Sequence, residues 1–259
     1  MRPIAVTDLS IGYGDRVIAD GINFVLEKND LAILIGPNGG GKTTLVKTIL
    51  GIIPPLSGTV EVLGCTVKHV CPHRKRIGYV PQMGRVPEHF PATLLDVVLS
   101  GLFPYKERFD RIGKEEKELA MRALEEVGLV DKKDEPFGNL SGGQQKRGLV
   151  ARALMGHPDA LIFDEPTSGV DIAAASDFRK KIIELHNKEE IPILLVTHDI
   201  NPYIDHLTKI IVIGRGRFRV GKLDILRDID FLREIYGESI KVIEVEGKFY
   251  LLSGDFHNV

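Results

Sequence analysis

The chain has 259 residues, of which 43% are hydrophobic and 27% are charged. This length allows a well-buried core, and the composition excludes disordered, collagen-like and coiled-coil chains. Lysine and arginine total 34 against 36 acidic residues, so the basic excess typical of nucleic-acid-binding proteins is absent. Two cysteines are too few for a disulfide scaffold and are typical of a reducing compartment. We therefore expect a globular cytoplasmic protein that reaches any membrane through a partner.

The predicted strands are of two kinds. Residues 1–30 and 57–65 alternate apolar and polar side chains, which predicts antiparallel strands with one face in water. Continuous apolar runs predict strands buried on both faces, as in a mostly parallel sheet; they are Leu31–Ile35, Ile77–Val80, Ala160–Phe163, Ile193–Thr197 and Ile210–Ile213.

Helical patterns lie between these runs. Lys42–Leu50 and Ile172–Asn187 carry apolar residues at helical spacing, and Asp171 is placed to cap the second helix. Strand, helix and strand in alternation predict an α/β fold. Residues 93–137 have no strand pattern and contain the charged helical stretch Lys114–Val127, which predicts an inserted helical subdomain.

We expect one domain over residues 1–259. Residues 1–92 and 138–235 would form the core with its antiparallel β subdomain, 93–137 the helical subdomain, and 236–259 a C-terminal hairpin or tail. The hairpin is predicted by alternating residues from Ile240 onward.

A glycine-rich loop follows the strand Leu31–Ile35 and precedes a helix. It reads Gly36, Pro37, Asn38, Gly39, Gly40, Gly41, Lys42, Thr43 and Thr44, and it fits G-x-x-x-x-G-K-[ST]. Its backbone amides and the helix N-terminus can cradle phosphates. Lys42 can neutralise the β- and γ-phosphates, and the Thr43 hydroxyl can bind Mg²⁺. The loop predicts binding of a nucleoside triphosphate with Mg²⁺.

An acidic pair ends the run Ala160–Phe163. Asp164 can orient the Mg²⁺ water shell, and Glu165 can act as a general base on the attacking water. A strand cap with a solvated turn is the alternative for an isolated Asp-Glu-Pro, and the phosphate loop makes it the weaker interpretation.

A second anion site precedes the predicted helix Gln144–Met155. Ser141 is a good N-cap, and Ser141, Gly142, Gly143 and Gln144 would present amide donors at the helix start. One chain holding one nucleotide has no obvious use for two phosphate cradles.

In these motifs, from about Ile4 to Tyr236, the chain resembles the nucleotide-binding subunits of ATP-binding cassette (ABC) transporters. Leu140–Gln144 resembles the signature motif that closes over ATP held by a second subunit. The resemblance implies that Gln82 is the lid glutamine, which contacts Mg²⁺ and the membrane partner, and that His198 is the switch histidine at the γ-phosphate. It also implies that Tyr13 stacks on adenine and that Asp171 belongs to the loop between subunits. The N-cap of the next helix is a competing interpretation of Asp171.

The resemblance implies a P-loop ATPase that forms a head-to-tail homodimer on ATP binding. Its implied partners are two integral membrane permease subunits and an extracytoplasmic solute-binding protein, with no nucleic acid. The chain would sit on the cytoplasmic face of the membrane. Residues 77–101 are similar to the subfamily that energises uptake of manganese, zinc or ferrous iron, and iron-chelate, haem and cobalamin importers have similar segments.

Other functions stay open at this point. An exporter subunit fits the same motifs, because no residue fixes the direction of transport. A non-transport cassette ATPase is disfavoured, because such proteins usually have two cassettes or long insertions. A regulatory module that never hydrolyses ATP is also disfavoured, because it would not need Lys42, Asp164, Glu165 and His198.

A separate metal-binding pattern lies in the β subdomain. Cys65, His69, Cys71 and His73 could share one face of a strand and hold zinc. Pro72 interrupts such a strand, and the spacing is not that of a standard zinc motif. We therefore interpret the segment as a solvated edge with incidental histidines.

Overall fold

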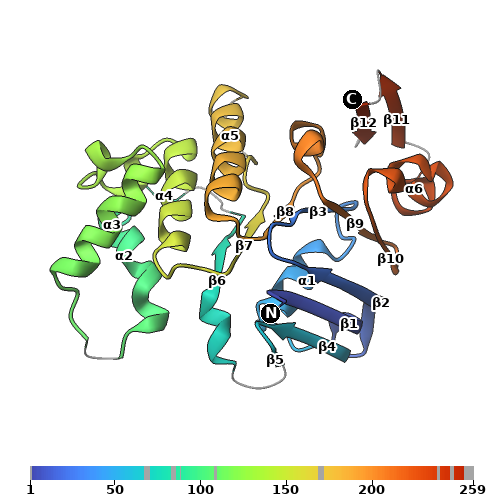
Figure 1. Cartoon of the computed structure of the whole chain (residues 1–259), viewed down its shortest axis with the longest axis horizontal. Helices are drawn as coiled ribbons and strands as arrows, with labels where there is room; N and C mark the ends of the chain where they lie inside the picture. The colour runs from blue at the N-terminus through green and yellow to red at the C-terminus, as the bar shows by residue number, and fades with distance from the viewer. Residues whose placement is uncertain are drawn as a thin grey trace. The chain divides into compact units, whose positions relative to one another are not determined.

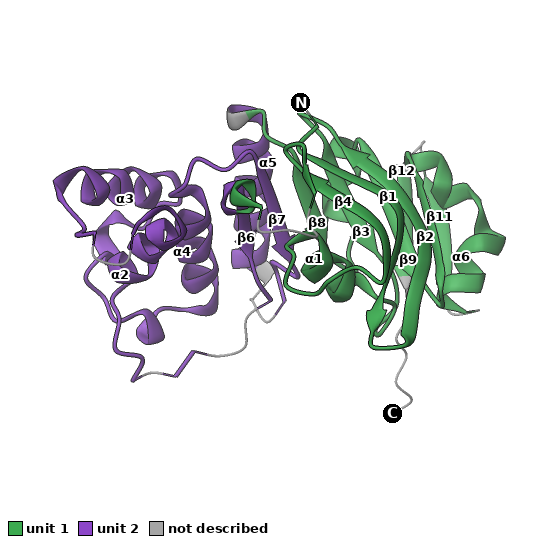
Figure 2. Cartoon of the chain, turned by 90° about the horizontal axis from the view of Figure 1, so that it is seen from below, with its two compact units in different colours: residues 1–74, 190–259 green, residues 75–189 purple. Residues whose placement is uncertain are grey.

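The computed structural model describes residues 2–66, 71–82, 86–87, 89–107, 110–168, 172–237, 240–245 and 248–253. The chain divides into two compact units (Figure 2), which consist of residues 1–74 with 190–259 and of residues 75–189. The predicted helical subdomain, residues 93–137, falls within the second unit. No helix among the described residues is long and apolar enough to span a membrane.

The first unit contains an antiparallel sheet with strand order β2-β1-β4-β5. Its strands are β1 (Ile4–Tyr13), β2 (Arg16–Leu26), β4 (Ser57–Val62) and β5 (Cys65–Thr66). Ile4, Val6, Ile22, Leu26, Val60 and Val62 are buried, while alternate residues reach solvent. The alternating pattern therefore predicts this sheet correctly.

The first unit also contains strands in the order β10-β9-β3-β8. They are β3 (Leu31–Ile35), β8 (Ile193–Val196), β9 (Lys209–Gly214) and β10 (Arg217–Gly221). Strand β3 pairs in parallel with β8 and β9, whereas β10 is antiparallel to β9. Every residue of β3 and β8 is buried, as continuous apolar runs require.

The described residues of the first unit also contain two α-helices and a hairpin (Figure 1). Helix α1 (Lys42–Ile49) packs on β1 and β4, and α6 (Ile229–Tyr236) packs on β9. Strands β11 (Ile240–Val245) and β12 (Lys248–Ser253) pair as an antiparallel hairpin. The Asn201 side chain accepts a hydrogen bond from Leu251 N at 3.0 Å and donates to Leu251 O at 3.4 Å, which ties the hairpin to the unit.

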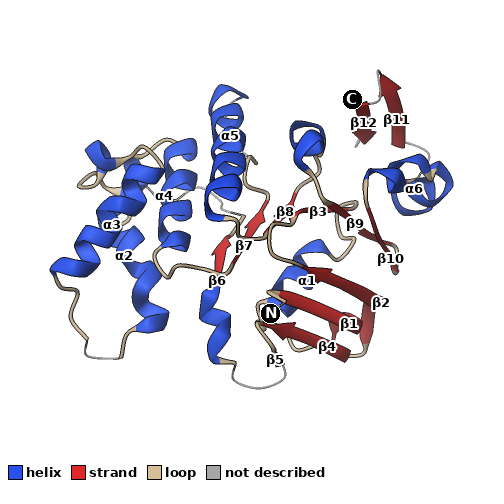
Figure 3. Ribbon diagram, viewed as in Figure 1, coloured by secondary structure: helices blue, strands red, loops and turns tan. Residues whose placement is uncertain are grey.

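The second unit contains a parallel strand pair and four α-helices among its described residues (Figure 3). The strands are β6 (Ile77–Val80) and β7 (Ala160–Asp164). The helices are α2 (Leu94–Leu99), α3 (Lys114–Glu126), α4 (Gly142–Leu154) and α5 (Ile172–Glu189). Helix α4 packs on α2, α3, α5 and β6, so it is the central element of the unit.

Short 3-10 helices connect the main elements. Their bounds are Pro72–Arg76, Ser100–Tyr105, Val130–Lys132, Phe137–Asn139, Asn201–His206 and Leu223–Arg227. The apolar patterns do not predict them, because one or two turns are too short to show helical periodicity.

Candidate nucleotide-binding site

The glycine-rich loop follows β3 and leads into α1, as predicted. Its backbone lies so close to β9 that a Cβ added at Gly36 would be 1.9 Å from the carbonyl oxygen of Ile213. A Cβ at Gly40 would be 2.9 Å from the Pro37 oxygen, and Gly41 adopts φ 103° at the helix N-cap. Glycine is therefore required at these positions by space and by backbone conformation.

Lys42 lies within this loop rather than in solvent. Its side chain is buried, and Nζ donates to Gly36 O at 2.8 Å and to Pro37 O at 3.0 Å. Thr43 is exposed at the same helix start, and Thr44 is buried. The loop thus concentrates an ammonium group, a helix N-terminus and an accessible hydroxyl, a set that suits Mg²⁺ with phosphates.

His198 is placed at the same sheet edge as the loop. It follows β8, and β8 pairs in parallel with β3 with Val196 opposite Leu34. The carboxyl ends of parallel neighbours share an edge, so the loop after β3 and the exposed His198 after β8 belong to one face of the first unit.

Tyr13 ends β1 and is 51% exposed. The β1–β2 hairpin that carries it approaches the loop, since a Cβ at Gly41 would lie 2.8 Å from Ile18 Cγ2 and 3.6 Å from Ile11 Cδ1. An exposed ring near a phosphate cradle is available for stacking on a base.

The acidic pair lies at the end of β7 in the second unit. Asp164 is buried, and the Tyr79 hydroxyl donates to its Oδ2 at 3.3 Å. Burial and the nearby Asp164 charge raise the pKa of Tyr79 to about 12, so the hydroxyl keeps its proton at neutral pH. Exposed Gln82 follows β6, the parallel neighbour of β7, and so lies at the same edge as Asp164 and Glu165.

The start of helix α4 has a complete capping box. Ser141 Oγ accepts from Gln144 N at 3.3 Å, and Gln144 Oε1 accepts from Ser141 N at 3.0 Å. The predicted N-cap is confirmed, and the helix begins at Gly142, two residues before the predicted start, because the cap includes both glycines. A hydroxyl that accepts one hydrogen bond can still donate its proton to a phosphate oxygen.

Two further residues of the second unit support the acidic pair, and the sequence motifs do not single them out. Tyr79 bonds Asp164, and Lys146 donates to the backbone of the following turn. Lys146 does have a signal in the sequence: it lies three and four residues before the inward-facing Leu149 and Val150, on the same face of the helix. Asp171 and its predicted role lie outside the described residues.

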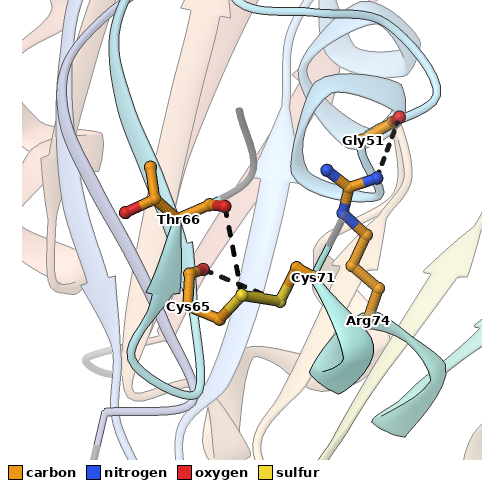
Figure 4. The surroundings of a disulfide bond; sticks show 5 residues. All are labelled: Gly51, Cys65, Thr66, Cys71 and Arg74. Atoms are coloured by element: carbon orange, nitrogen blue, oxygen red, sulfur yellow. Dashed lines mark hydrogen bonds between the residues drawn. A yellow bond between two sulfur atoms is a disulfide. The ribbon is translucent and has the colours of Figure 1, made fainter. Parts of the chain in front are cut away.

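The two cysteines of the β subdomain differ from the expected reduced pair. Cys65 and Cys71 form a disulfide with a Cα–Cα distance of 5.9 Å (Figure 4), and Cys71 is buried rather than on a solvated edge. Disulfide sulfurs carry no thiolate to bind zinc. Among the described residues no three His, Cys, Asp or Glu side chains gather as a metal site, and His69 lies outside those residues.

The fold and the loop define a P-loop nucleotide-binding protein. The ABC transporter family model matches residues 19–168, more than half of the chain. The chain therefore belongs to the ABC transporter family and has the fold of its ATP-hydrolysing cassettes.

Relatives with known roles are similar over most of their length. The manganese transport ATP-binding protein MntB of Bacillus subtilis is 35% identical, covering 92% of this chain and 93% of its own. The zinc uptake ATP-binding protein ZurA of Listeria innocua is 39% identical, covering 80% and 82%. The zinc transport ATP-binding protein AdcC of Streptococcus pneumoniae is 33% identical, covering 84% and 92%.

Solved structures agree with the fold. A chain of an ABC transporter described as of metal-chelate type, in an inward-facing conformation, has a TM-score of 0.81 at 26% identity, covering 97% of this chain and 96% of that one. A dimeric cassette in a post-hydrolysis state, bound to ADP and phosphate, has a TM-score of 0.72 at 25% identity, covering 85% and 98%.

Proposed function

We propose that this chain is the ATPase subunit of a transporter that takes up a divalent metal ion, manganese or zinc. The cargo is inferred from the 35% and 39% identity of this chain to manganese and zinc transport subunits, over most of this chain and of each relative. The ATPase role rests on family membership together with the loop at Gly36–Thr44 and the pair Asp164 and Glu165.

The loop would hold the phosphates of ATP. Phosphate oxygens are stronger acceptors for the Lys42 ammonium than the two loop carbonyls that it contacts, because they carry charge. Backbone amides at the start of α1 would bind the same phosphates. The Thr43 hydroxyl, the Gln82 amide and the Asp164 carboxylate would hold Mg²⁺, which, when bound, neutralises phosphate charge.

Glu165 would act as the general base. It directly follows the buried end of β7, and its side chain is half-buried rather than fully solvated. A carboxylate at this point can accept a proton from the attacking water, while the His198 imidazole bonds the γ-phosphate. Asp164 and Glu165 thus have separate roles, one toward the metal and one toward water.

The second phosphate cradle would complete the site of another copy. Ser141, Gly142, Gly143 and Gln144 would bind the γ-phosphate of ATP held by the partner loop, and Asp171 would lie between the subunits. A structural relative that is dimeric with bound ADP and phosphate supports the formation of a dimer. The dimer would act on two membrane permease subunits, with an extracytoplasmic solute-binding protein delivering the metal, and would work at the cytoplasmic face of the membrane.

Uptake of radiolabelled metal tests this proposal. Cells that express the chain with its neighbouring transport genes would be given Mn²⁺, Zn²⁺ and Fe²⁺ separately, with Lys42→Ala as the matched control. We expect energy-dependent accumulation of manganese or zinc that is lost in the control. Equal accumulation with both variants for all three metals would contradict the metal-uptake proposal.

A metal chelate is the second candidate cargo. It is favoured by the structural likeness to a transporter described as of metal-chelate type, with a TM-score of 0.81. The same cells given a labelled ferric chelate distinguish the two: uptake of the chelate without uptake of free ions would favour the second candidate.

A further inference from the structure

Lys146 is a buried lysine whose ammonium group faces the backbone next to the acidic pair. The residue is 6% exposed on α4, and Nζ donates to Glu165 O at 3.3 Å and to Ser168 O at a shorter distance. Burying an ammonium group is costly unless it is hydrogen-bonded or paired with a charge. A lysine in this position therefore needs a function that a neutral apolar residue would not provide.

The bonded segment is a tight turn with an unusual backbone. Glu165 has φ 49°, in the left-handed region that non-glycine residues rarely adopt, and Ser168 N donates to Glu165 O at 3.2 Å. Such a conformation is energetically unfavourable and persists only where surrounding contacts determine it. The Glu165 carbonyl thus accepts from the turn itself and from the Lys146 ammonium.

The charges of Lys146 and Glu165 also interact. Burial lowers the pKa of Lys146, and the negative charge of Glu165 partly opposes this effect. The ammonium is therefore close enough to interact with the Glu165 carboxylate as well as to bond the Glu165 carbonyl.

The geometry points to Lys146 as a positioning residue for ATP hydrolysis, one that holds the turn from Glu165 to Ser168 so that the Glu165 carboxylate is set for the attacking water. The same side chain joins α4, whose first turn carries Ser141 and Gln144, to that turn. This inference rests on the proposed role of Glu165 as the general base.

The test uses the full chain, three variants at Lys146 and one control variant. Lys146→Met keeps the length of the side chain but removes its donors, Lys146→Arg keeps donors and charge, and Lys146→Gln keeps donors without charge. Lys114→Met is the matched control, because Lys114 is 91% exposed on α3. The readouts are kcat and KM for ATP from phosphate release, the Kd of a fluorescent ATP analogue, and the thermal midpoint.

We expect Lys146→Met to lower kcat at least about tenfold with KM and Kd within about twofold of wild type, because only the step at Glu165 loses its positioning. Lys146→Arg should restore kcat to within about threefold, and Lys146→Gln should fall between the two. Should Lys146→Met not fold, Lys146→Gln decides: the inference requires at least a threefold lower kcat at unchanged Kd.

Wild-type kcat in Lys146→Met, or in Lys146→Gln, would overturn the inference. So would a loss of nucleotide binding equal to the loss of kcat, since that indicates a general structural role. Failure of the proposed function is distinguishable: in that case the wild type and Glu165→Gln would release phosphate equally, whatever happens at Lys146.

Discussion

At the residue scale, the segment from Asp164 to Ser168 receives hydrogen bonds from two side chains on different elements. Tyr79 on β6 donates to Asp164, and Lys146 on α4 donates to Glu165 and Ser168. Tyr79 thus bonds the carboxylate assigned to Mg²⁺, and Lys146 bonds the backbone that carries the carboxylate assigned to water. Fixed groups of this kind reduce the reorganisation needed during reaction.

The variant Tyr79→Phe tests the hydrogen bond between Tyr79 and Asp164 through the pH dependence of stability. Because the pKa of Tyr79 is raised from 10.0 to about 12, the folded state holds the proton more tightly than the unfolded state. The associated stability is fully present below pH 10 and is lost as pH rises toward 12. We expect the free energy of unfolding of the wild type to fall over this range more steeply than that of Tyr79→Phe.

Urea denaturation at pH 9, 10 and 11 would measure the difference. Tyr105 and Tyr236 also have raised pKa values, so both proteins lose stability, and the comparison isolates the part due to Tyr79. Parallel curves for the two proteins would contradict the assigned environment of Tyr79.

At the scale of elements, helix α4 determines how the second unit is packed. It contacts α2, α3, α5 and β6, and the buried Gln145 amide donates to Phe137 O at 3.0 Å in the turn before the signature segment. Gly148 lies in the middle of this helix, where glycine costs about 0.5–1 kcal/mol relative to alanine. Close packing accounts for the glycine, because an added Cβ would lie 2.6 Å from Leu94 Cδ1 and 3.2 Å from Phe137 Cε2.

Gly148→Ala should therefore destabilise the protein although alanine favours helix. Leu94 and Phe137 are both buried and have little room to move away, and overpacking of this kind costs about 1–3 kcal/mol, against a gain in helix propensity of about 0.5–1 kcal/mol. Thermal or urea denaturation would show a lower stability, whereas the exposed control Lys117→Ala should stay within about 0.5 kcal/mol of wild type. Higher stability for Gly148→Ala would show that the helix is not held this closely.

Much of the fold is predictable from short stretches of sequence. Strands such as Leu31–Ile35 and Ile77–Val80 are found with their predicted bounds, because burial on both faces requires an unbroken apolar run. The loop at Gly36–Thr44 is equally predictable, since its glycines and lysine lie close together in the sequence.

Other features depend on contacts between distant residues and escape a local pattern. Tyr79 and Asp164 are 85 positions apart, and nothing near Tyr79 in the sequence indicates the bond. The position of Lys146 indicates burial, but its bonds go to Glu165 and Ser168, which are 19 and 22 positions away in the sequence. The disulfide between Cys65 and Cys71 depends on the path of the backbone that brings them together, and two cysteines alone do not predict it.

At the scale of the whole molecule, the proposed active site is shared between two copies. Mixing two inactive variants tests this: Lys42→Ala removes the loop ammonium, and Ser141→Arg blocks the signature segment. A mixed head-to-tail dimer contains one site with both parts intact, so phosphate release should reappear on mixing. Either variant mixed with itself is the control, and no recovery in the mixture would contradict sharing of the site.

The measurement that tests the central claim most directly is ATP turnover by Glu165→Gln compared with wild type. We expect wild-type protein to hydrolyse ATP in the presence of Mg²⁺, with a specific activity that rises with protein concentration because the proposed dimer forms more often at high concentration. Glu165→Gln should bind ATP normally, release almost no phosphate, and form an ATP-dependent dimer in gel filtration. An unchanged rate of phosphate release in Glu165→Gln would contradict the account.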